Sequence, residues 1–243
     1  MRRMAGFTLV ELLVCIAIIA LLSAILMPVV ATAKRFGTRG VCSSNLAQIG
    51  KAIESYASDY DGCYPNCNDP YLWMGRHWRW LLKDYLAFYA EYDVANPKGR
   101  DQITGVTNTI LACPSDPSPV DKYDKTSYGL SAAFYHTPEQ IDSMTTAQLY
   151  LTSGPECSTV SVSQVVYPAS KAIAADWLGS HTGDNSGWWS WTGSRTHLFA
   201  DGHVQFLKAT AINPAISPHS DVVRTPYPDI NLTTNGVHGK DVE

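Results

Sequence analysis

The sequence predicts an α+β protein in which a long N-terminal helix packs on a small head domain with an antiparallel sheet. Three observations in the 243 residues lead to this prediction. Residues 12–30 form an uncharged apolar run, and apolar side chains then recur at helical spacing as far as Tyr56. Short strand-like runs separated by turn residues follow Pro65. We therefore expect a helix over residues 7–59 and a head domain over residues 61–243.

The first part of the helix, residues 7–30, is long enough to cross a membrane. The nineteen uncharged residues from Leu12 to Val30 extend roughly 28 Å at about 1.5 Å per residue, close to the hydrocarbon thickness of a bilayer. A cleaved signal peptide has a shorter apolar region of about 7–15 residues with a small-residue cleavage site after it. We therefore expect a retained transmembrane helix. Basic residues on both sides of it leave its orientation open.

Residues 31–60 are expected to continue the helix as an amphipathic segment. Pro28 should kink the helix, and Asp61-Gly62 together with Pro65 should end it, because these residues favour turns and break helical hydrogen bonding. One face of the segment carries the apolar residues Val41, Leu46, Ile49, Ile53 and Tyr56.

The head domain is predicted to mix short helices and strands. A short amphipathic helix is expected over residues 77–89, and a capping box formed by Thr137 and Gln140 should start a helix that reaches about Tyr150. Strands are expected within residues 109–113, 127–135 and 160–177.

The strongest local signal in the head domain is a hairpin over residues 195–208. Asp201-Gly202 favours a two-residue type I′ turn between two strand-like runs. That register would pair His197 with Phe206 and would place His197 and His203 on opposite faces. The simplest metal site, one that uses both histidines, is therefore not expected.

The composition narrows the possible functions. A formal net charge of -4 and scattered Lys and Arg residues argue against nucleic acid as a partner. The sequence has no Gly-x-Ser-x-Gly, phosphate-loop or His-Glu-x-x-His motif, so we do not expect an enzyme or a cofactor. Cys15 lies in the apolar run, and the other five cysteines are disulfide candidates whose pairing the sequence leaves open.

The stretch GFTLVELLV at residues 6–14 resembles the prepilin leader junction of type IV pilins and of the pseudopilins of type II secretion. The resemblance implies that residues 1–6 are a leader, that a prepilin peptidase cuts between Gly6 and Phe7, and that Phe7 is then methylated. The apolar helix would stay attached to the protein. By the same resemblance, Glu11 is the assembly glutamate, which pairs with the N-terminal ammonium of a neighbouring subunit, and Pro28 is the family's helix-kinking proline.

Three further stretches are similar to a group of pseudopilin-like proteins. They are residues 42–65, which continue the helix, residues 112–116, and residues 198–207, which contain the Asp-Gly-His-Val turn. The hallmark of that group also includes a histidine ten positions before the aspartate. Trp191 stands there instead, so no role of that histidine transfers to this chain.

Two weaker site hypotheses concern the loop before the hairpin. Asp184 and Asn185, with Asp176 and Asp201 nearby, could offer oxygen ligands to calcium, as major pseudopilins do in a C-terminal loop. A plain polar turn is the simpler interpretation. Trp188, Trp189 and Trp191 could stack on sugars or on another subunit, although packing beneath a loop explains them more simply.

The resemblance implies a structural subunit of a type II secretion pseudopilus or of a type IV pilus-like filament. Its partners would be prepilin peptidase, other pilin or pseudopilin subunits and the inner-membrane secretion machinery. It would sit in the inner membrane by a single span with a periplasmic head, and then in a periplasmic or cell-surface filament. The alternative is a membrane-anchored surface domain that binds polysaccharide or another ligand and forms no filament.

Overall fold

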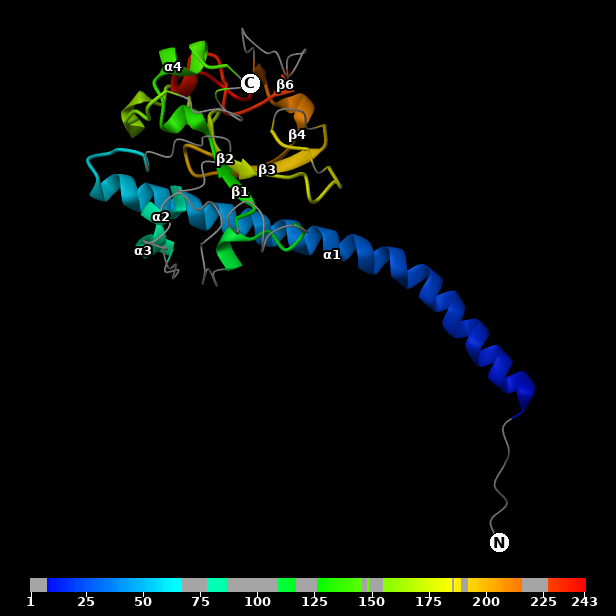
Figure 1. Ribbon diagram of the computed structural model, residues 1–243. Helices are drawn as coiled ribbons and strands as arrows, with labels where there is room; N and C mark the ends of the chain where they lie inside the picture. Colours follow the sequence, from blue (N-terminus) through cyan, green and yellow to red (C-terminus); the bar gives the residue numbers. More distant parts are fainter. Residues whose placement is uncertain are drawn as a thin grey trace, which may run out of the picture.

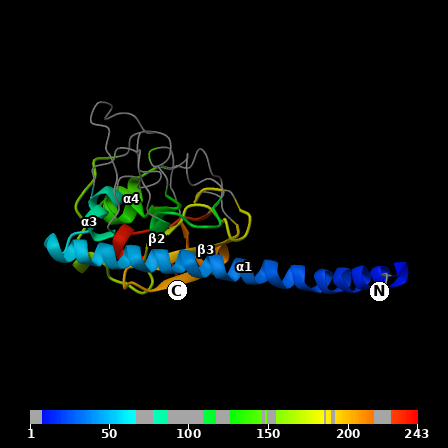
Figure 2. The same cartoon turned by 90° about the horizontal axis from the view of Figure 1, so that it is seen from below.

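The structure, a computed structural model, describes residues 8–66, 78–86, 109–116, 126–145, 148, 155–184, 186–188, 192–215 and 227–243. A single long helix, α1 (Leu9–Asp59), carries a head domain over its C-terminal half. Its N-terminal half projects away from the head in both views (Figure 1 and Figure 2). The predicted α+β architecture with a long N-terminal helix is confirmed.

Helix α1 is continuous over 51 residues. Pro28 lies inside it without ending it, and Figure 1 shows a gradual curve over the exposed half. The helix ends where predicted, because Asp61 and Gly62 adopt left-handed conformations with φ of 51° and 73° that turn the chain away. Gly62 N–H then donates to Ala57 O at 2.7 Å, which satisfies one of the last free carbonyls.

The head domain contains a four-stranded antiparallel sheet in the order β1-β2-β3-β4. A second sheet of two short strands lies near the C-terminus. The strands of both sheets are β1 (Tyr128–Leu130), β2 (Ala172–Asp176), β3 (Ser194–Phe199), β4 (Val204–Lys208), β5 (Pro214–Ala215) and β6 (Tyr227–Pro228).

Short helices fill the rest of the described head. The capping box at Thr137 is present as predicted, but α4 ends at Ser143, well before the predicted end at Tyr150. Residues 109–111 and 162–164 are 3-10 turns, so the strands predicted there are wrong. The helices are α2 (Trp78–Leu81), α3 (Lys83–Leu86), α4 (Pro138–Ser143), η2 (Thr109–Leu111), η4 (Ala132–Phe134), η5 (Val162–Gln164), η6 (Ala209–Ala211) and η7 (Gly236–His238).

Strands β1 and β2 and most of β3 are buried on both sides, which explains why β2 reads as AIAAD and does not alternate, whereas the edge strand β4 is partly exposed. On one side the apolar face of α1 packs against it, and Leu46, Ile49 and Ile53 are buried there. The close approach depends on Gly50, since a Cβ at that position would lie 2.9 Å from Leu198 Cδ1. A second cluster covers the other side with Trp177, Phe199, Ile212 and Ile230 among its members.

The β3–β4 hairpin differs from its predicted register. Leu198 pairs with Val204 and His197 with Gln205, so the loop has three residues, Ala200–Gly202. Within it only Gly202 has a positive φ, of 88°, and Gly202 N–H donates to Phe199 O at 2.9 Å. This is a type I turn followed by a left-handed glycine, which forms a bulge. The predicted type I′ turn is wrong.

The observed register changes the faces of the hairpin on which its two histidines lie. With one extra loop residue, His197 and His203 fall on the same face of the hairpin, not on opposite faces. Even so, His203 stacks on Phe199 and its Nδ1 lies 2.5 Å from Asp201 Oδ1, while His197 is buried. No metal-ligand group in the described part of the chain contains both histidines.

A disulfide between Cys42 and Cys113 fastens α1 to the head. Next to it, Asn45 Nδ2 donates to Ala112 O at 3.1 Å and to Tyr128 Oη at 3.2 Å. The disulfide and these two hydrogen bonds therefore join the helix to the η2 segment and to β1. A covalent link of this kind reduces the conformational freedom of the unfolded chain.

Replacing both Cys42 and Cys113 by Ala should destabilise the head. The two residues are separated by 71 positions, for which loop-closure entropy predicts a loss of about 4 kcal/mol. Urea unfolding of the detergent-solubilised protein, followed by tryptophan fluorescence, would measure it. Cys63→Ala is the matched control, since Cys63 forms no disulfide, and should have a small effect. An unchanged midpoint in the double variant would contradict the role of the bond.

Candidate functional site

The N-terminal half of α1 is an exposed apolar surface. Large apolar side chains from Leu9 to Val30 are solvent-accessible over most of their area, with Leu9 78% exposed and Met27 73% exposed. The most apolar part of the helix is long enough to span a membrane, and none of it is buried against the described part of the head. We refer to residues 9–30 as the apolar stalk. A surface of this size has to be covered by lipid or by protein.

The only charged side chain in the apolar stalk is Glu11, which takes part in the N-terminal cap of α1. Thr8 is the N-cap residue, and its hydroxyl accepts a hydrogen bond from Glu11 N–H at 3.2 Å. In return, Glu11 Oε2 accepts from Thr8 N–H at 2.9 Å and from Thr8 Oγ1–H at 2.7 Å. This reciprocal arrangement is a capping box. The sequence signal for this capping box is the Thr-x-x-Glu pattern of Thr8 and Glu11, which stands directly before an apolar run.

The capping box gives Glu11 two distinct roles. Its carboxylate oxygen satisfies a backbone donor that would otherwise be free at the start of the helix. The negative charge also lies at the positive end of the helix dipole. Gly6 and Phe7, the predicted processing and methylation residues, lie outside the described residues.

Basic residues mark the place where the stalk meets the head. Lys34 and Arg35 are exposed, and Arg39 is half-buried. The Arg39 guanidinium lies 4.6 Å from the centre of the Phe206 ring on β4 and 5.1 Å from that of Phe36. Cation–π contacts of this kind stabilise the side chain at the edge of the head. The charged segment separates the apolar stalk from the part of α1 that packs on the sheet.

The N-terminal sequence matches the family model described as the prokaryotic N-terminal methylation motif over residues 1–27. The match supports a type IV pilin-like prepilin segment. It covers the predicted leader, the predicted cleavage junction and most of the apolar stalk, and it does not extend to the head. No curated protein and no solved structure matches the chain.

Asp184, one of the predicted calcium ligands, organises its own loop. Its Oδ1 accepts from Ser186 N–H at 2.9 Å, and its Oδ2 accepts from Thr192 N–H at 3.0 Å and from Gly193 N–H at 3.4 Å. Arg195 NH2 lies 3.7 Å from the same Oδ2. The backbone donors keep the pKa of Asp184 below its usual value although burial opposes them.

The other predicted calcium ligands do not join Asp184. Asp201 lies at the far end of the six-residue strand β3, roughly 20 Å away along the strand. Asp176 is fully buried, accepts from Thr196 N–H at 2.9 Å, and burial raises its pKa to about 6. Asn185 lies outside the described residues. Calcium binding at this loop stays a prediction for Asp184 and Asn185 alone.

Trp188, predicted as a possible stacking residue for a ligand, belongs to the core. It is 2% exposed, its indole Nε1–H donates to Asp176 O at 2.9 Å, and its ring lies 5.4 Å from that of Trp177. The ring also fits against Gly129, where a Cβ would approach it to 3.0 Å. The stacking role is therefore wrong for Trp188. Trp189 and Trp191 lie outside the described residues.

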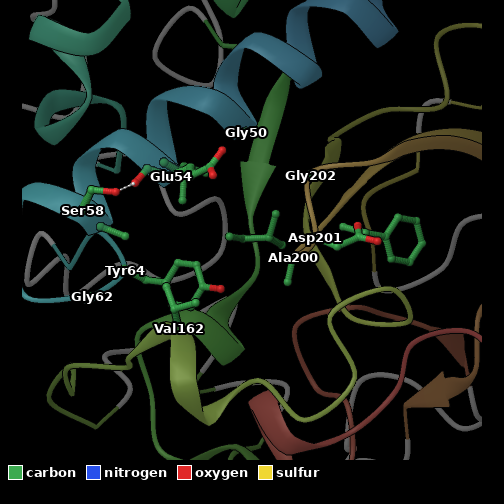
Figure 3. A pocket seen from close by; sticks show the side chains of 13 residues that line it. Gly50, Glu54, Ser58, Gly62, Tyr64, Val162, Ala200, Asp201 and Gly202 are labelled. Carbon is green, nitrogen blue, oxygen red and sulfur yellow. Dashed lines mark hydrogen bonds between the residues drawn. The ribbon is translucent and has the colours of Figure 1, made fainter.

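A pocket of about 470 Å³ lies between α1 and the turn of the β3–β4 hairpin (Figure 3). Glu54 and Ser58 border it from the helix, Tyr64 from the segment after the helix, and Asp201 from the hairpin turn. Burial raises the pKa of Tyr64 to about 12. No spacing pattern in the sequence indicates this pocket, because the residues that line it come from five separate segments.

Lowering the pH should weaken the head because His197 is buried in its neutral form. Burial lowers its pKa to about 3, and the positive charge of Arg195 adds to the effect. The unfolded chain takes up this proton near pH 6.5. Stability is therefore fully present above pH 6.5 and is lost as pH falls towards 3, by about 3 kcal/mol at pH 4.5. Asp176, with its raised pKa, offsets part of the loss below pH 6.

Urea unfolding at pH 7 and pH 4.5 would measure this effect. The loss in free energy of unfolding between pH 7 and pH 4.5 should be smaller in His197→Gln than in the wild-type protein. The control is His203→Gln, since His203 is exposed on the hairpin turn. An unchanged pH difference in His197→Gln would show that His197 does not carry the effect.

Proposed function

We propose that the protein is a structural subunit of a type II secretion pseudopilus or of a type IV pilus-like filament, cut by prepilin peptidase and methylated on Phe7. The observation that carries this proposal is the apolar stalk, with its single carboxylate at the N-terminal end. The match to the methylation motif at residues 1–27, which includes most of the apolar stalk, agrees with it. In this proposal the protein acts by helix-to-helix assembly and not by catalysis.

The apolar stalk would have two environments in turn. In the inner membrane, lipid covers it and the head lies in the periplasm. During assembly the stalk leaves the lipid and is covered by the stalks of sister subunits, so the apolar surface remains out of water in both states. The inner-membrane secretion machinery would move each subunit from one environment to the other.

Glu11 would set the register of each added subunit. A charged side chain in a membrane helix costs a few kcal/mol unless it reaches the interface or a partner. The new ammonium at Phe7, which cleavage after Gly6 creates, is a partner of opposite charge on a neighbouring copy. Pairing the two lowers the cost of removing both from water, while a misplaced subunit would leave the carboxylate unpaired.

The capping box allows the charge of Glu11 to be tested apart from its capping role. Glu11→Gln keeps an oxygen that can accept from Thr8 N–H, and Gln is an accepted capping-box residue. We expect Glu11→Gln to lose filaments, seen by electron microscopy of the sheared fraction, while membrane insertion is unchanged. Thr8→Val removes the hydroxyl and costs about 1 kcal/mol of helix stability but should still assemble. Normal filaments in Glu11→Gln would refute the register role.

Processing can be tested on the mature N-terminus by mass spectrometry. We expect a chain that begins at Phe7 and carries one methyl group. Gly6→Leu should leave the leader in place, because the small residue before the cut is replaced, and should leave the protein in the membrane without filaments. A mature chain that begins at Met1, or after Ala31, would contradict the proposal.

The alternative function, an anchored domain that binds polysaccharide, makes a different prediction for the head. Trp189→Ala would then abolish glycan binding, and Glu11→Gln would have no phenotype. The filament proposal expects that Trp189→Ala still forms filaments and that Glu11→Gln does not.

A further inference from the structure

A buried lysine and a buried aspartate meet in the head, far from the apolar stalk. Lys171 immediately precedes β2, and Asp241 is the third residue from the C-terminal end of the sequence. Lys171 Nζ lies 3.1 Å from Asp241 Oδ2 and 3.3 Å from Oδ1. The side chains are 0% and 2% exposed. An ion pair this fully removed from water is unusual, since desolvation of both charges offsets much of their attraction.

Two further groups complete the cluster. The Thr233 hydroxyl accepts from Lys171 Nζ at 2.6 Å and donates to Asp241 Oδ1. The backbone N–H of Ala172 donates to Asp241 Oδ2 at 2.8 Å. The two carboxyl oxygens are therefore held differently, because Oδ1 faces a hydroxyl that also contacts the amine, whereas Oδ2 faces a backbone donor. The buried carboxylate of Asp229 also acts on Lys171 through its charge.

The surroundings favour the neutral forms of both partners. Burial lowers the pKa of Lys171 and raises the pKa of Asp241, although their mutual attraction opposes each shift. A neutral amine is a nucleophile and a protonated carboxyl is an electrophile, whereas an ammonium and a carboxylate do not react. The fixed contact also replaces a bimolecular encounter, which can lower a reaction barrier by several kcal/mol.

We propose that Lys171 and Asp241 condense to form an intramolecular amide bond, a covalent crosslink between the start of β2 and the C-terminal segment. A proton first moves from the ammonium to the carboxylate. The Nζ lone pair then attacks Asp241 Cγ, which forms the C–N bond and moves the carbonyl electron pair onto Oδ2. The Ala172 N–H stabilises the negative charge on Oδ2.

The second half of the reaction releases one water molecule. Thr233 Oγ1 takes a hydrogen from Nζ and passes its own to Oδ1. Oδ1 then carries two hydrogens and leaves as water while the Oδ2 carbonyl re-forms. The product is an amide, every atom is accounted for, and no oxidant or cofactor is required. Lys171 and Asp241 are the reacting groups, and Thr233 relays the proton between them.

The crosslink would attach a C-terminal segment that backbone hydrogen bonds already hold in place. Asp241 N–H donates to Ser170 O at 2.8 Å, and Asn213 N–H donates to Asp241 O at 2.7 Å. The bond would fix the last residues of the chain to β2, a buried strand at the centre of the sheet. Separating Asp241 from Lys171 would then require a covalent bond to break, and the closed loop would reduce the conformational freedom of the unfolded chain. This inference concerns the head alone and does not depend on filament formation.

Mass spectrometry of the full-length wild-type protein, purified from membranes, tests the proposal directly. After reduction and denaturation, the intact mass should be lower by one water than the mass calculated for its own mature sequence, with any methyl group on the N-terminus included. A protease digest should yield one branched peptide that joins Lys171 to Asp241. Peptide analysis is needed because Asp61-Gly62 and Asp201-Gly202 can also lose water by forming cyclic imides. A full intact mass with separate Lys171 and Asp241 peptides would overturn the proposal.

Two variants test the assigned roles. Lys171→Met has no amine and should show the full mass. Thr233→Val keeps both reacting groups but lacks the relay, so the branched peptide should form more slowly after synthesis. If Thr233→Val crosslinked at the wild-type rate, the relay would be wrong. The wild-type measurement decides the main claim even if Lys171→Met fails to fold.

Discussion

The architecture depends on one constraint, which is that the apolar stalk cannot remain in water. Half of α1 carries large exposed apolar side chains with no cover from the described head. A soluble domain would bury such a helix in its own core, as α1 does farther along, where Leu46, Ile49 and Ile53 pack on the sheet. The change from exposed to buried within one helix separates the part that meets partners from the part that supports the head.

The head has the connections that a filament subunit under load would need. The Cys42–Cys113 disulfide joins it to α1, and Gly50 allows the helix to approach Leu198 closely. The Lys171–Asp241 cluster holds the C-terminal segment on β2. A force applied to the stalk would therefore reach the sheet through covalent and tightly packed contacts. The capping box formed by Thr8 and Glu11 secures the other end of the helix.

Local signals in the sequence predicted the ends of the long helix and one capping box, but not the turn type of the hairpin or the strands expected near residues 109–113 and 160–166. The helix boundaries followed from apolar spacing and from Asp61-Gly62, and the capping box at Thr137 appeared as expected. Features set by contacts between distant residues could not be predicted. The hairpin register depended on one bulge at Gly202, the partner of Cys42 lay 71 positions away, and Trp188 was drawn into the core by Trp177 and Gly129. Lys171 and Asp241 carry no pattern that would connect them.

A reconstruction of sheared filaments by electron cryo-microscopy would test the central claim most directly. We expect residues 9–30 of each copy to lie in the filament core, covered by the same residues of neighbouring copies, with Glu11 beside the amino group of another subunit. Filaments built from head contacts alone, with the stalk absent or facing solvent, would contradict this account.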